Sequence, residues 1–200
     1  MHSQSEPLVF VISGISGAGK DSVIKAIQQR GLPIHFVVTA TSRPKRPHEE
    51  EGVDYFFVSR QRFEEMIARD ELIEHAVVYG EYKGVPRQQV LDALASGKDV
   101  LLRVDVQGAL TLRQQFPQAV LIFLSAENLE EVAQRLENRS TEEEEELRRR
   151  LETAQWELEH LCKFDYWVVN RRGQLEKTVD TLIAIMQAEH HRICRQRSSP

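Results

Sequence analysis

A glycine-rich segment that directly follows a short apolar run is the part of this chain best suited to chemistry. The sequence GISGAGKD occupies positions 14–21, after the apolar residues 8–12. The spacing G-x-x-x-x-G-K is typical of a loop whose backbone N–H groups surround the phosphates of a nucleotide, with the lysine reaching the β- and γ-phosphates. Glycines let the backbone approach the phosphates, and the following helix directs its positive end toward them. The alternative interpretation is a plain glycine-rich turn between a strand and a helix.

The last position of this pattern departs from the usual one. It commonly carries Ser or Thr, whose hydroxyl binds Mg²⁺, but here it is Asp21. A carboxylate at that position can bind Mg²⁺ directly, or it can repel the phosphates and act through water. The sequence therefore predicts that a nucleotide contacts a continuous set of loop residues: Gly14, Ile15, Ser16, Gly17, Ala18, Gly19, Lys20, Asp21 and Ser22.

A second candidate site is the basic segment 39–47, in which Arg43 and Arg46 flank prolines. Prolines stiffen the backbone, and arginine binds pairs of phosphate oxygens through two parallel hydrogen bonds. Tyr55 and Tyr82 can each add a phenolic donor. The alternative is a solvated basic turn, but the nucleotide loop in the same chain favours a second phosphate site.

Two carboxylates lie where they can face a ligand. Glu74 belongs to an expected strand over 72–78, on the face opposite to Ile73. Asp105 follows an apolar strand, and the carboxyl ends of parallel strands are where ligands bind in open α/β sheets. Asp105 can bind Mg²⁺ through water or accept a hydrogen bond from a substrate. The alternative for Asp105 is an N-cap ahead of Gly108.

Three arginines, Arg135, Arg139 and Arg150, follow the fourth expected core strand. Arginines on a mobile segment can close over transferring phosphates and neutralise their charge. The alternative is surface pairing with the neighbouring glutamates, and sequence alone does not separate the two.

The elements that must position these residues alternate between apolar runs and helical patterns, which predicts an α/β fold with a largely parallel sheet. We expect core strands at 8–13, 99–104, 119–124 and 166–169, and helices at 20–30, 108–115, 129–138, 142–161 and 175–192. Between them, short strands at 35–40, 54–58 and 72–78 around a helix at 61–69 indicate a small inserted lobe.

The composition bounds the function. The 200 residues are 41% apolar and 28% charged, with a net charge of −5, which argues against general affinity for nucleic acid. The two cysteines, Cys162 and Cys194, lack metal-ligand spacing and favour a reducing compartment. With no signal peptide or membrane span in the sequence, we expect a cytoplasmic protein that binds small molecules and no membrane, as a monomer or homodimer.

Taken together, these segments resemble the guanylate kinase family. The phosphate loop is followed, in that family's order, by SRPKR at 42–46, GVDYFFV at 52–58, Glu74, YGEY at 79–82, DVQG at 105–108, RLENR at 135–139 and DYWVVN at 165–170. The resemblance covers residues 8–190, and the sequence is most similar to the form of the family found in plant organelles and some bacteria.

The resemblance implies a P-loop nucleoside-monophosphate kinase fold. Its core would comprise 8–34, 95–124 and 163–190, with a GMP-binding lobe at 35–94 and a helical lid at 125–162. It implies phosphoryl transfer from ATP to GMP, and to dGMP, with Mg²⁺, in purine nucleotide metabolism.

The resemblance also assigns roles to residues. The GMP phosphate would be held by Arg43, Arg46, Tyr55 and Tyr82, and guanine would be recognised by Thr39, Glu74 and Asp105. The transferring phosphoryl would be stabilised by Lys20, Arg135, Arg139 and Arg150, and Asn170 would lie near adenine. The candidate Mg²⁺ ligands are Asp21 and Asp105.

Four positions depart from the common family pattern: Asp21, Lys83, Val85 and Arg103. Lys83 replaces a frequent tyrosine, Val85 a serine that touches guanine, and Arg103 an acidic residue, so base selectivity is the property most affected. Two alternatives stay open. One is ribose 1,5-bisphosphate phosphokinase, and the other is a non-catalytic domain of this fold that binds phosphopeptides.

Overall fold

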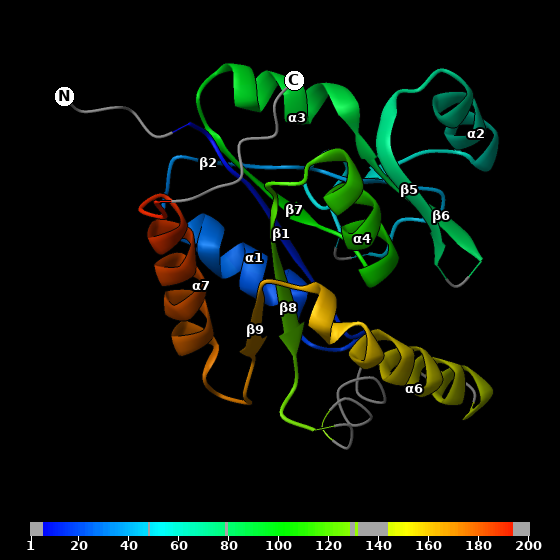
Figure 1. Ribbon diagram of the computed structural model, residues 1–200. Helices are drawn as coiled ribbons and strands as arrows, with labels where there is room; N and C mark the ends of the chain where they lie inside the picture. The colour runs from blue at the N-terminus through cyan, green and yellow to red at the C-terminus, as the bar shows by residue number, and fades with distance from the viewer. Residues whose placement is uncertain (1–5, 48, 79, 129–130, 132–143, 194–200) are drawn as a thin grey trace.

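A five-stranded parallel sheet forms the centre of the protein (Figure 1). The computed structural model describes residues 6–47, 49–78, 80–128, 131 and 144–193. The strand order is β2 (Ile34–Phe36), β7 (Asp99–Arg103), β1 (Val9–Gly14), β8 (Val120–Ser125) and β9 (Tyr166–Val169). Every neighbouring pair in this sheet is parallel, so the carboxyl ends of all five strands lie at one edge, where α/β proteins bind ligands.

Helices cover both faces of this sheet because its strands are apolar on both sides. Phe10 and Ile12 pack toward a core that includes residues of α1 (Lys20–Gln29) and α7 (Leu175–Glu189). Val9 and Val11 pack toward a second core with residues of α3 (Arg87–Ala95) and α4 (Val106–Gln115). The period-2 alternation of β1 thus divides its side chains between the two layers.

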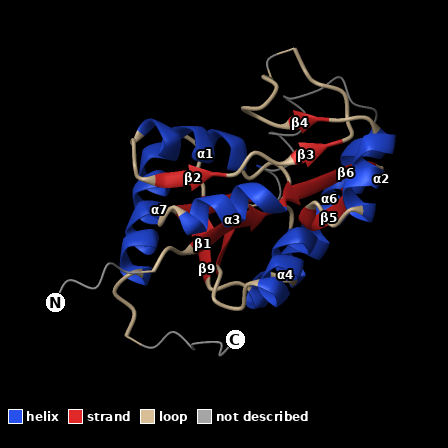
Figure 2. Ribbon diagram, turned by 90° about the horizontal axis from the view of Figure 1, so that it is seen from above, coloured by secondary structure: helices blue, strands red, loops and turns tan. Residues whose placement is uncertain are grey.

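A smaller, four-stranded sheet lies beside the main one (Figure 2). Its order is β4 (Phe56–Phe57), β3 (Ala40–Thr41), β6 (Glu81–Pro86) and β5 (Leu72–Val78). The helix α2 (Arg60–Ala68) packs on it through Phe63 and Met66. Ser59 caps this helix by accepting a hydrogen bond from the N–H of Arg62 at 3.1 Å.

The boundary between the two sheets differs from the expected one. The expected lobe strand at 35–40 is two strands: β2 pairs with β7 in the main sheet, and only β3 joins the smaller sheet. The helix α3, which the sequence patterns did not indicate, also packs on the main sheet through Val90 and Ala93. The smaller sheet therefore spans 40–86, inside the expected 35–94.

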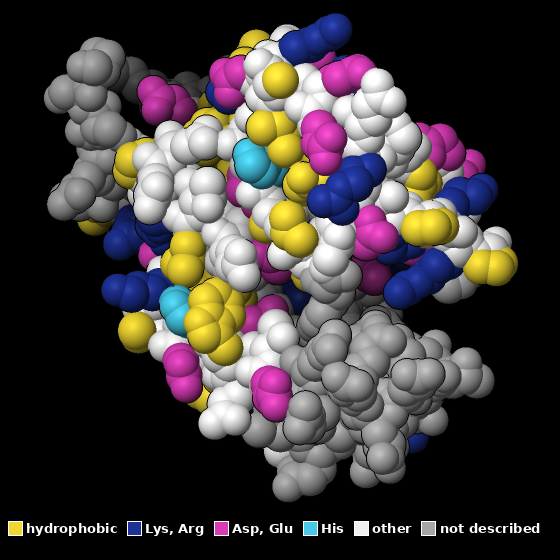
Figure 3. Space-filling model, turned by 90° about the vertical axis from the view of Figure 1, so that its right-hand side faces the viewer, with side chains coloured by type: hydrophobic (Ala, Val, Ile, Leu, Met, Phe, Trp, Pro, Cys, Tyr) yellow, Lys and Arg dark blue, Asp and Glu magenta, His cyan; other side chains and the backbone are white. Residues whose placement is uncertain are grey.

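The helix α6 (Glu144–Glu159) extends beyond the carboxyl edge of the main sheet (Figure 1). The helix expected at 129–138 lies outside the described residues. On the face of the molecule that carries the smaller sheet, Lys and Arg side chains are interspersed with Asp and Glu (Figure 3). Among the described residues, no helix is long and apolar enough to cross a membrane.

Candidate active site

The glycine-rich loop connects β1 to α1 at the carboxyl edge of the main sheet. Gly14 has a φ of 124°, and a Cβ on it would lie 1.9 Å from the carbonyl oxygen of Leu124 on β8. No other residue fits there, because both the backbone conformation and the space exclude a side chain. Gly19, with a φ of 88°, precedes α1. The glycines therefore give this loop the tight path that the sequence predicted.

Lys20 lies folded over the loop. Its Nζ donates hydrogen bonds to the carbonyl oxygens of Gly14, at 2.6 Å, and Ile15, at 3.0 Å. Burial lowers the pKa of Lys20, although the carboxylates of Glu157 and Asp21 act in the opposite direction. A half-buried ammonium beside loop carbonyls and peptide N–H groups is suited to an anion that brings negative charge into the loop.

Two side chains from distant parts of the chain hold the loop from outside. Asn170 donates from Nδ2 to the carbonyl oxygen of Ala18 at 2.8 Å and accepts a hydrogen bond from Thr178. Glu157 of α6 accepts a hydrogen bond from the N–H of Ser16 at 3.0 Å. Burial raises the pKa of Glu157, while Lys20 opposes that rise. Asn170 thus supports the backbone of the phosphate loop.

Sequence reasoning missed Glu157. The signal for it was weak but present: Glu157 lies three residues after Ala154, on the buried stripe of α6, and is only 5% exposed. A carboxylate on a buried stripe needs a partner, and here the partner is the phosphate loop.

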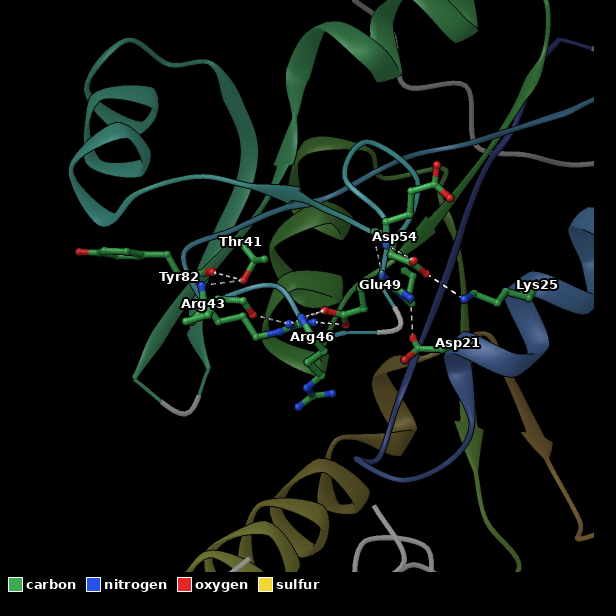
Figure 4. A network of polar contacts seen from close by, with 11 residues as sticks. Asp21, Lys25, Thr41, Arg43, Arg46, Glu49, Asp54 and Tyr82 are labelled. Carbon is green, nitrogen blue, oxygen red and sulfur yellow. Dashed lines mark hydrogen bonds and ion pairs between the residues drawn. The ribbon is translucent and has the colours of Figure 1, made fainter. Parts of the chain in front are cut away.

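The basic segment folds into a turn that holds Arg43 against Glu49 (Figure 4). The Arg43 guanidinium donates two hydrogen bonds to the Glu49 carboxylate, at 2.7 and 2.5 Å, and lies 4.9 Å from the centre of the Tyr55 ring. Burial raises the pKa of Glu49, but hydrogen bonds from Arg43 and Arg46 outweigh this and hold the pKa below its ordinary value. The ion pair orients Arg43 beside Tyr55.

Arg46 is tied to the same carboxylate through its backbone N–H, at 2.9 Å from Glu49 Oε2. Its guanidinium points away from Glu49 (Figure 4) and is exposed. Arg43 and Arg46 thus occupy one turn, as predicted, with the Arg46 side chain directed outward.

The structure does not bring Tyr82 to this cluster. The Tyr82 ring stacks on Phe63 of α2, with 5.0 Å between the ring centres, and its hydroxyl donates to Glu64 at 3.4 Å. The side chain points away from Arg43 and Arg46 (Figure 4). Because neighbouring residues of a strand face opposite ways, Lys83 takes the inward place. Burial lowers the pKa of Lys83, and it interacts electrostatically with Asp105, Arg103 and Arg43.

Asp21 is part of a network that joins α1 to the turn before β4. Arg103, at the end of β7, donates to Asp21 Oδ1 at 2.5 Å and to the carbonyl oxygen of Asp54 at 3.2 Å. Lys25 pairs with the Asp54 carboxylate at 3.0 Å, and Figure 4 shows Asp21 and Lys25 reaching from α1 toward that turn. Arg103, which the sequence left unassigned, is therefore the residue that connects the two regions.

The side chains of Glu74 and Asp105 interact with each other near the start of α4. Asp105 caps α4, since its Oδ1 accepts a hydrogen bond from the N–H of Gly108 at 2.9 Å, which confirms the N-cap alternative. The Glu74 carboxyl is 4% exposed and packs directly on Gly108, where a Cβ would lie 2.7 Å from Oε1. Burial, reinforced by the negative charge of Asp105, raises the pKa of Glu74 to about 8.

Among the remaining candidates, the structure describes the side chain of Thr39 but not the side chains of the three arginines. Thr39 is buried at 5% exposure, and its carbonyl oxygen accepts the N–H of Phe56 at 2.9 Å. Arg135 and Arg139 lie outside the described residues, and Arg150 lies on α6 where only the backbone is described.

The geometry therefore combines an anion-binding loop, a cluster of cations beside it, and a buried acceptor carboxyl. The loop suits a polyphosphate and the cluster a second phosphate. Glu74 suits a ligand with N–H donors, since a carboxylate accepts hydrogen bonds.

Comparisons with known proteins agree with this combination. The family model described as guanylate kinase matches residues 6–189. The chain is 49% identical over 189 residues to guanylate kinase 2, chloroplastic/mitochondrial, of Oryza sativa subsp. japonica, a match that covers 94% of this chain and 66% of the plant protein. It is 43% identical over 183 residues to a guanylate kinase of Halalkalibacterium halodurans, covering 92% of this chain and 89% of that one.

The fold is similar as well. The crystal structure of guanylate kinase from Anaplasma phagocytophilum superimposes with a TM-score of 0.77 at 33% identity, covering 96% of this chain and 90% of that chain. The family match over residues 6–189 includes the phosphate loop and all five strands of the main sheet. The chain belongs to the guanylate kinase family, with the P-loop nucleoside-monophosphate kinase fold.

Proposed function

We propose that this protein transfers the γ-phosphoryl group of ATP to GMP, giving ADP and GDP, and that it serves purine nucleotide metabolism. The observation that carries the proposal is the buried Glu74 carboxyl, which packs on Gly108 and interacts electrostatically with Asp105, a neighbour in turn of Lys20 in the phosphate loop. Guanine presents its N1–H and 2-amino group as two adjacent donors, which a carboxylate can accept together. Adenine has no such pair of donors at that edge.

Each side of the site supports one substrate. On the donor side, Lys20 and the loop N–H groups would hold the ATP phosphates. On the acceptor side, Arg43, Arg46 and Tyr55 would hold the GMP phosphate. An oxygen of the GMP phosphate attacks the γ-phosphorus, the bond from the γ-phosphorus to the β–γ bridging oxygen breaks, and ADP leaves. The attacking oxygen is already an anion, so positioning and charge neutralisation do the work and no general base is needed.

The moving parts would be the smaller sheet, as the GMP-binding lobe, and α6 with the segment before it, as the lid. Arg135, Arg139 and Arg150 keep their proposed role on that segment, where cations can neutralise the charge of the transferring group. Thr39 and Asp105 would take part in recognising guanine, as the resemblance implies.

The magnesium ion that the family implies finds no built site in the described residues. Asp21 is ion-paired with Arg103, and Asp105 caps α4. The described residues contain no cluster of three or more potential metal-ligating side chains. Mg²⁺ ordinarily keeps several waters and binds substrate phosphates.

The direct test is ADP release with ATP, Mg²⁺ and a panel of acceptors: GMP, dGMP, AMP, UMP and ribose 1,5-bisphosphate. We expect turnover with GMP and dGMP, and rates at least about 10²-fold lower with AMP and UMP. Turnover of ribose 1,5-bisphosphate with indifference to GMP would replace the proposal with a sugar-phosphate kinase. Absence of turnover from a folded protein that binds ATP would favour a binding domain.

Arg43→Ala is expected to raise the KM for GMP by about tenfold or more, because a hydrogen bond from a charged donor is lost. The KM for ATP should change by less than about twofold. Arg62→Ala is the control, since Arg62 also pairs with a glutamate, Glu71, at 2.7 Å, although this pair is more exposed than that of Arg43 and Glu49. It should leave both constants unchanged. Equal increases for both substrates in Arg43→Ala would remove Arg43 from the acceptor site.

Gly108→Ala is expected to raise the KM for GMP by about tenfold. Alanine ordinarily stabilises a helix interior relative to glycine, but here the new methyl group would lie 2.7 Å from Glu74 Oε1 and displace the carboxyl. Combining Gly108→Ala with Glu74→Asp shortens the acid by one methylene and should recover part of the GMP affinity. An unchanged KM for GMP in Gly108→Ala would show that the position of the Glu74 carboxyl does not matter.

A further inference from the structure

We propose that Arg103 is a further substrate-binding residue, which binds the phosphate of the acceptor nucleotide, and that Asp21 is the residue that positions it. This inference rests on the proposed function. It gives two of the four positions that depart from the family pattern a joint role. In place of a hydroxyl and an acidic residue, this chain has an acidic residue and an arginine that bind each other.

The placement of Arg103 is the first observation. It ends β7, beside the phosphate loop that follows β1, at the carboxyl edge of the main sheet. Its guanidinium lies 4.7 Å from the centre of the Tyr55 ring, and the Arg43 guanidinium lies 4.9 Å from the same ring. Two arginines therefore flank one tyrosine, and all three side chains can donate to phosphate oxygens.

The environment of Lys83 is the second observation. Its ammonium forms no ion pair or hydrogen bond with any residue that the structure describes, although it interacts electrostatically with Arg103, Arg43 and Asp105. Burial lowers its pKa, and the two neighbouring guanidinium groups add to that effect. A half-buried cation without a partner, next to two arginines, is explained by an anion that binds among them. The carboxylates of Asp105 and Asp21 act in the opposite direction on Lys83, but neither pairs with its ammonium, and a nucleotide phosphate would supply that partner.

The contacts of Arg103 explain how it is held ready. Its side chain is only 16% exposed, and its hydrogen bonds go to Asp21 Oδ1 and to the carbonyl oxygen of Asp54. Asp54 directly precedes Tyr55, so Arg103 also fixes the backbone that carries this tyrosine. Asp21 belongs to the first turn of α1, and it therefore aligns the acceptor-side guanidinium with the donor-side loop. Guanidinium groups present several donors, so a phosphate can bind while Asp21 remains in contact.

The first experiment measures equilibrium binding of GMP and of guanosine by calorimetry, without ATP, to the wild type and to the Arg103→Met and Arg103→Lys variants. We expect Arg103→Met to weaken GMP binding by about tenfold or more and to leave guanosine binding within about twofold. Arg103→Lys keeps the charge but loses the two-point geometry, so its GMP affinity should lie between those of the wild type and Arg103→Met. GMP binding unchanged in Arg103→Met, or GMP and guanosine weakened equally, would overturn the phosphate contact.

The second experiment tests the role of Asp21. Asp21→Asn should weaken GMP binding by about threefold to fivefold when Arg103 is present and have no effect in the Arg103→Met background, because it acts through Arg103. If Asp21→Asn instead raises the Mg²⁺ requirement in both backgrounds and leaves GMP binding unchanged, Asp21 is a metal ligand and not a positioning residue.

The matched control is Arg113→Met. Arg113 of α4 pairs with Asp165 at 2.5 Å, the same distance as the pair of Arg103 and Asp21, but at the opposite end of the main sheet. Its loss should lower thermal stability without changing GMP binding. A wild-type protein that neither binds nor phosphorylates GMP would refute the proposed function, whereas normal GMP turnover in Arg103→Met would refute only this inference.

Discussion

Lys20→Met is expected to lower kcat by about 10²- to 10³-fold, the loss typical of removing one preorganised donor from a transition state. Lys20 is the ammonium at the centre of the phosphate loop, and its present partners are the carbonyl oxygens of Gly14 and Ile15. In phosphoryl transfer the protein acts by placing positive charge around the moving group. Removing that charge therefore acts mainly on turnover, which the ADP-release assay measures.

The fold should survive this change. Burial lowers the pKa of Lys20, which means that the folded protein disfavours its charged form. An apolar side chain of similar length removes this cost, so the melting temperature should stay equal or rise slightly. Lys25→Met is the control on the same helix: Lys25 is 56% exposed and pairs with Asp54, and its loss should change kcat by less than about threefold. A near wild-type kcat in Lys20→Met would exclude the loop as the ATP site.

The main sheet was predictable because its strands are continuous apolar runs. The strand β9 has the expected bounds 166–169, β7 ends one residue earlier than expected, and β1 and β8 are each shifted by one residue toward the C-terminus. The short strand β2 was assigned to the wrong sheet because three residues show no usable periodicity, and its partner β7 lies more than 60 residues away in the sequence. The strand β6 was missed because its first three residues are polar and only Gly84 and Val85 are buried.

The site was predictable where one short segment supplies several groups, as in the phosphate loop and the turn of Arg43 and Arg46. It was not predictable where the contact joins distant segments. Arg103 and Asp21 are 82 residues apart, and Ser16 and Glu157 are 141 residues apart. The choice between Tyr82 and Lys83 could have been made from strand alternation, since only one of two neighbours can face the site. That argument required β6 to be recognised as a strand.

Glu74→Gln is expected to reduce the preference for GMP over AMP by about 10²-fold. A glutamine offers one acceptor oxygen and an amide that opposes the guanine donors, so two charge-assisted hydrogen bonds are lost or reversed. AMP makes no such bonds, and its turnover should change little. The measurement is kcat/KM for both acceptors at saturating ATP. An unchanged ratio would show that another group recognises the base.

The pKa of Glu74 makes this prediction depend on pH. With a pKa of about 8 in the empty site, the carboxyl is mostly protonated at pH 7, whereas guanine requires the carboxylate. GMP binding is therefore coupled to the release of a proton, and GMP affinity should rise with pH up to about 8 and then level off. The phosphate of GMP titrates near pH 6 as well, but Glu74→Gln shares that contribution. The difference between wild type and Glu74→Gln isolates the carboxyl, and an identical pH dependence in both would contradict its titration.

Stability should change in the opposite direction to affinity. The folded-state pKa of Glu74 lies above its ordinary value of 4.5, so between about pH 4.5 and 8 the folded protein retains a proton that the unfolded chain has lost. The free energy of unfolding then falls as pH rises through this range. Glu74→Gln carries no titrating group, so its melting temperature should exceed that of the wild type increasingly from pH 5 to pH 8. A variant that is more stable and less selective would show that the buried carboxyl is retained for recognition, at the expense of stability.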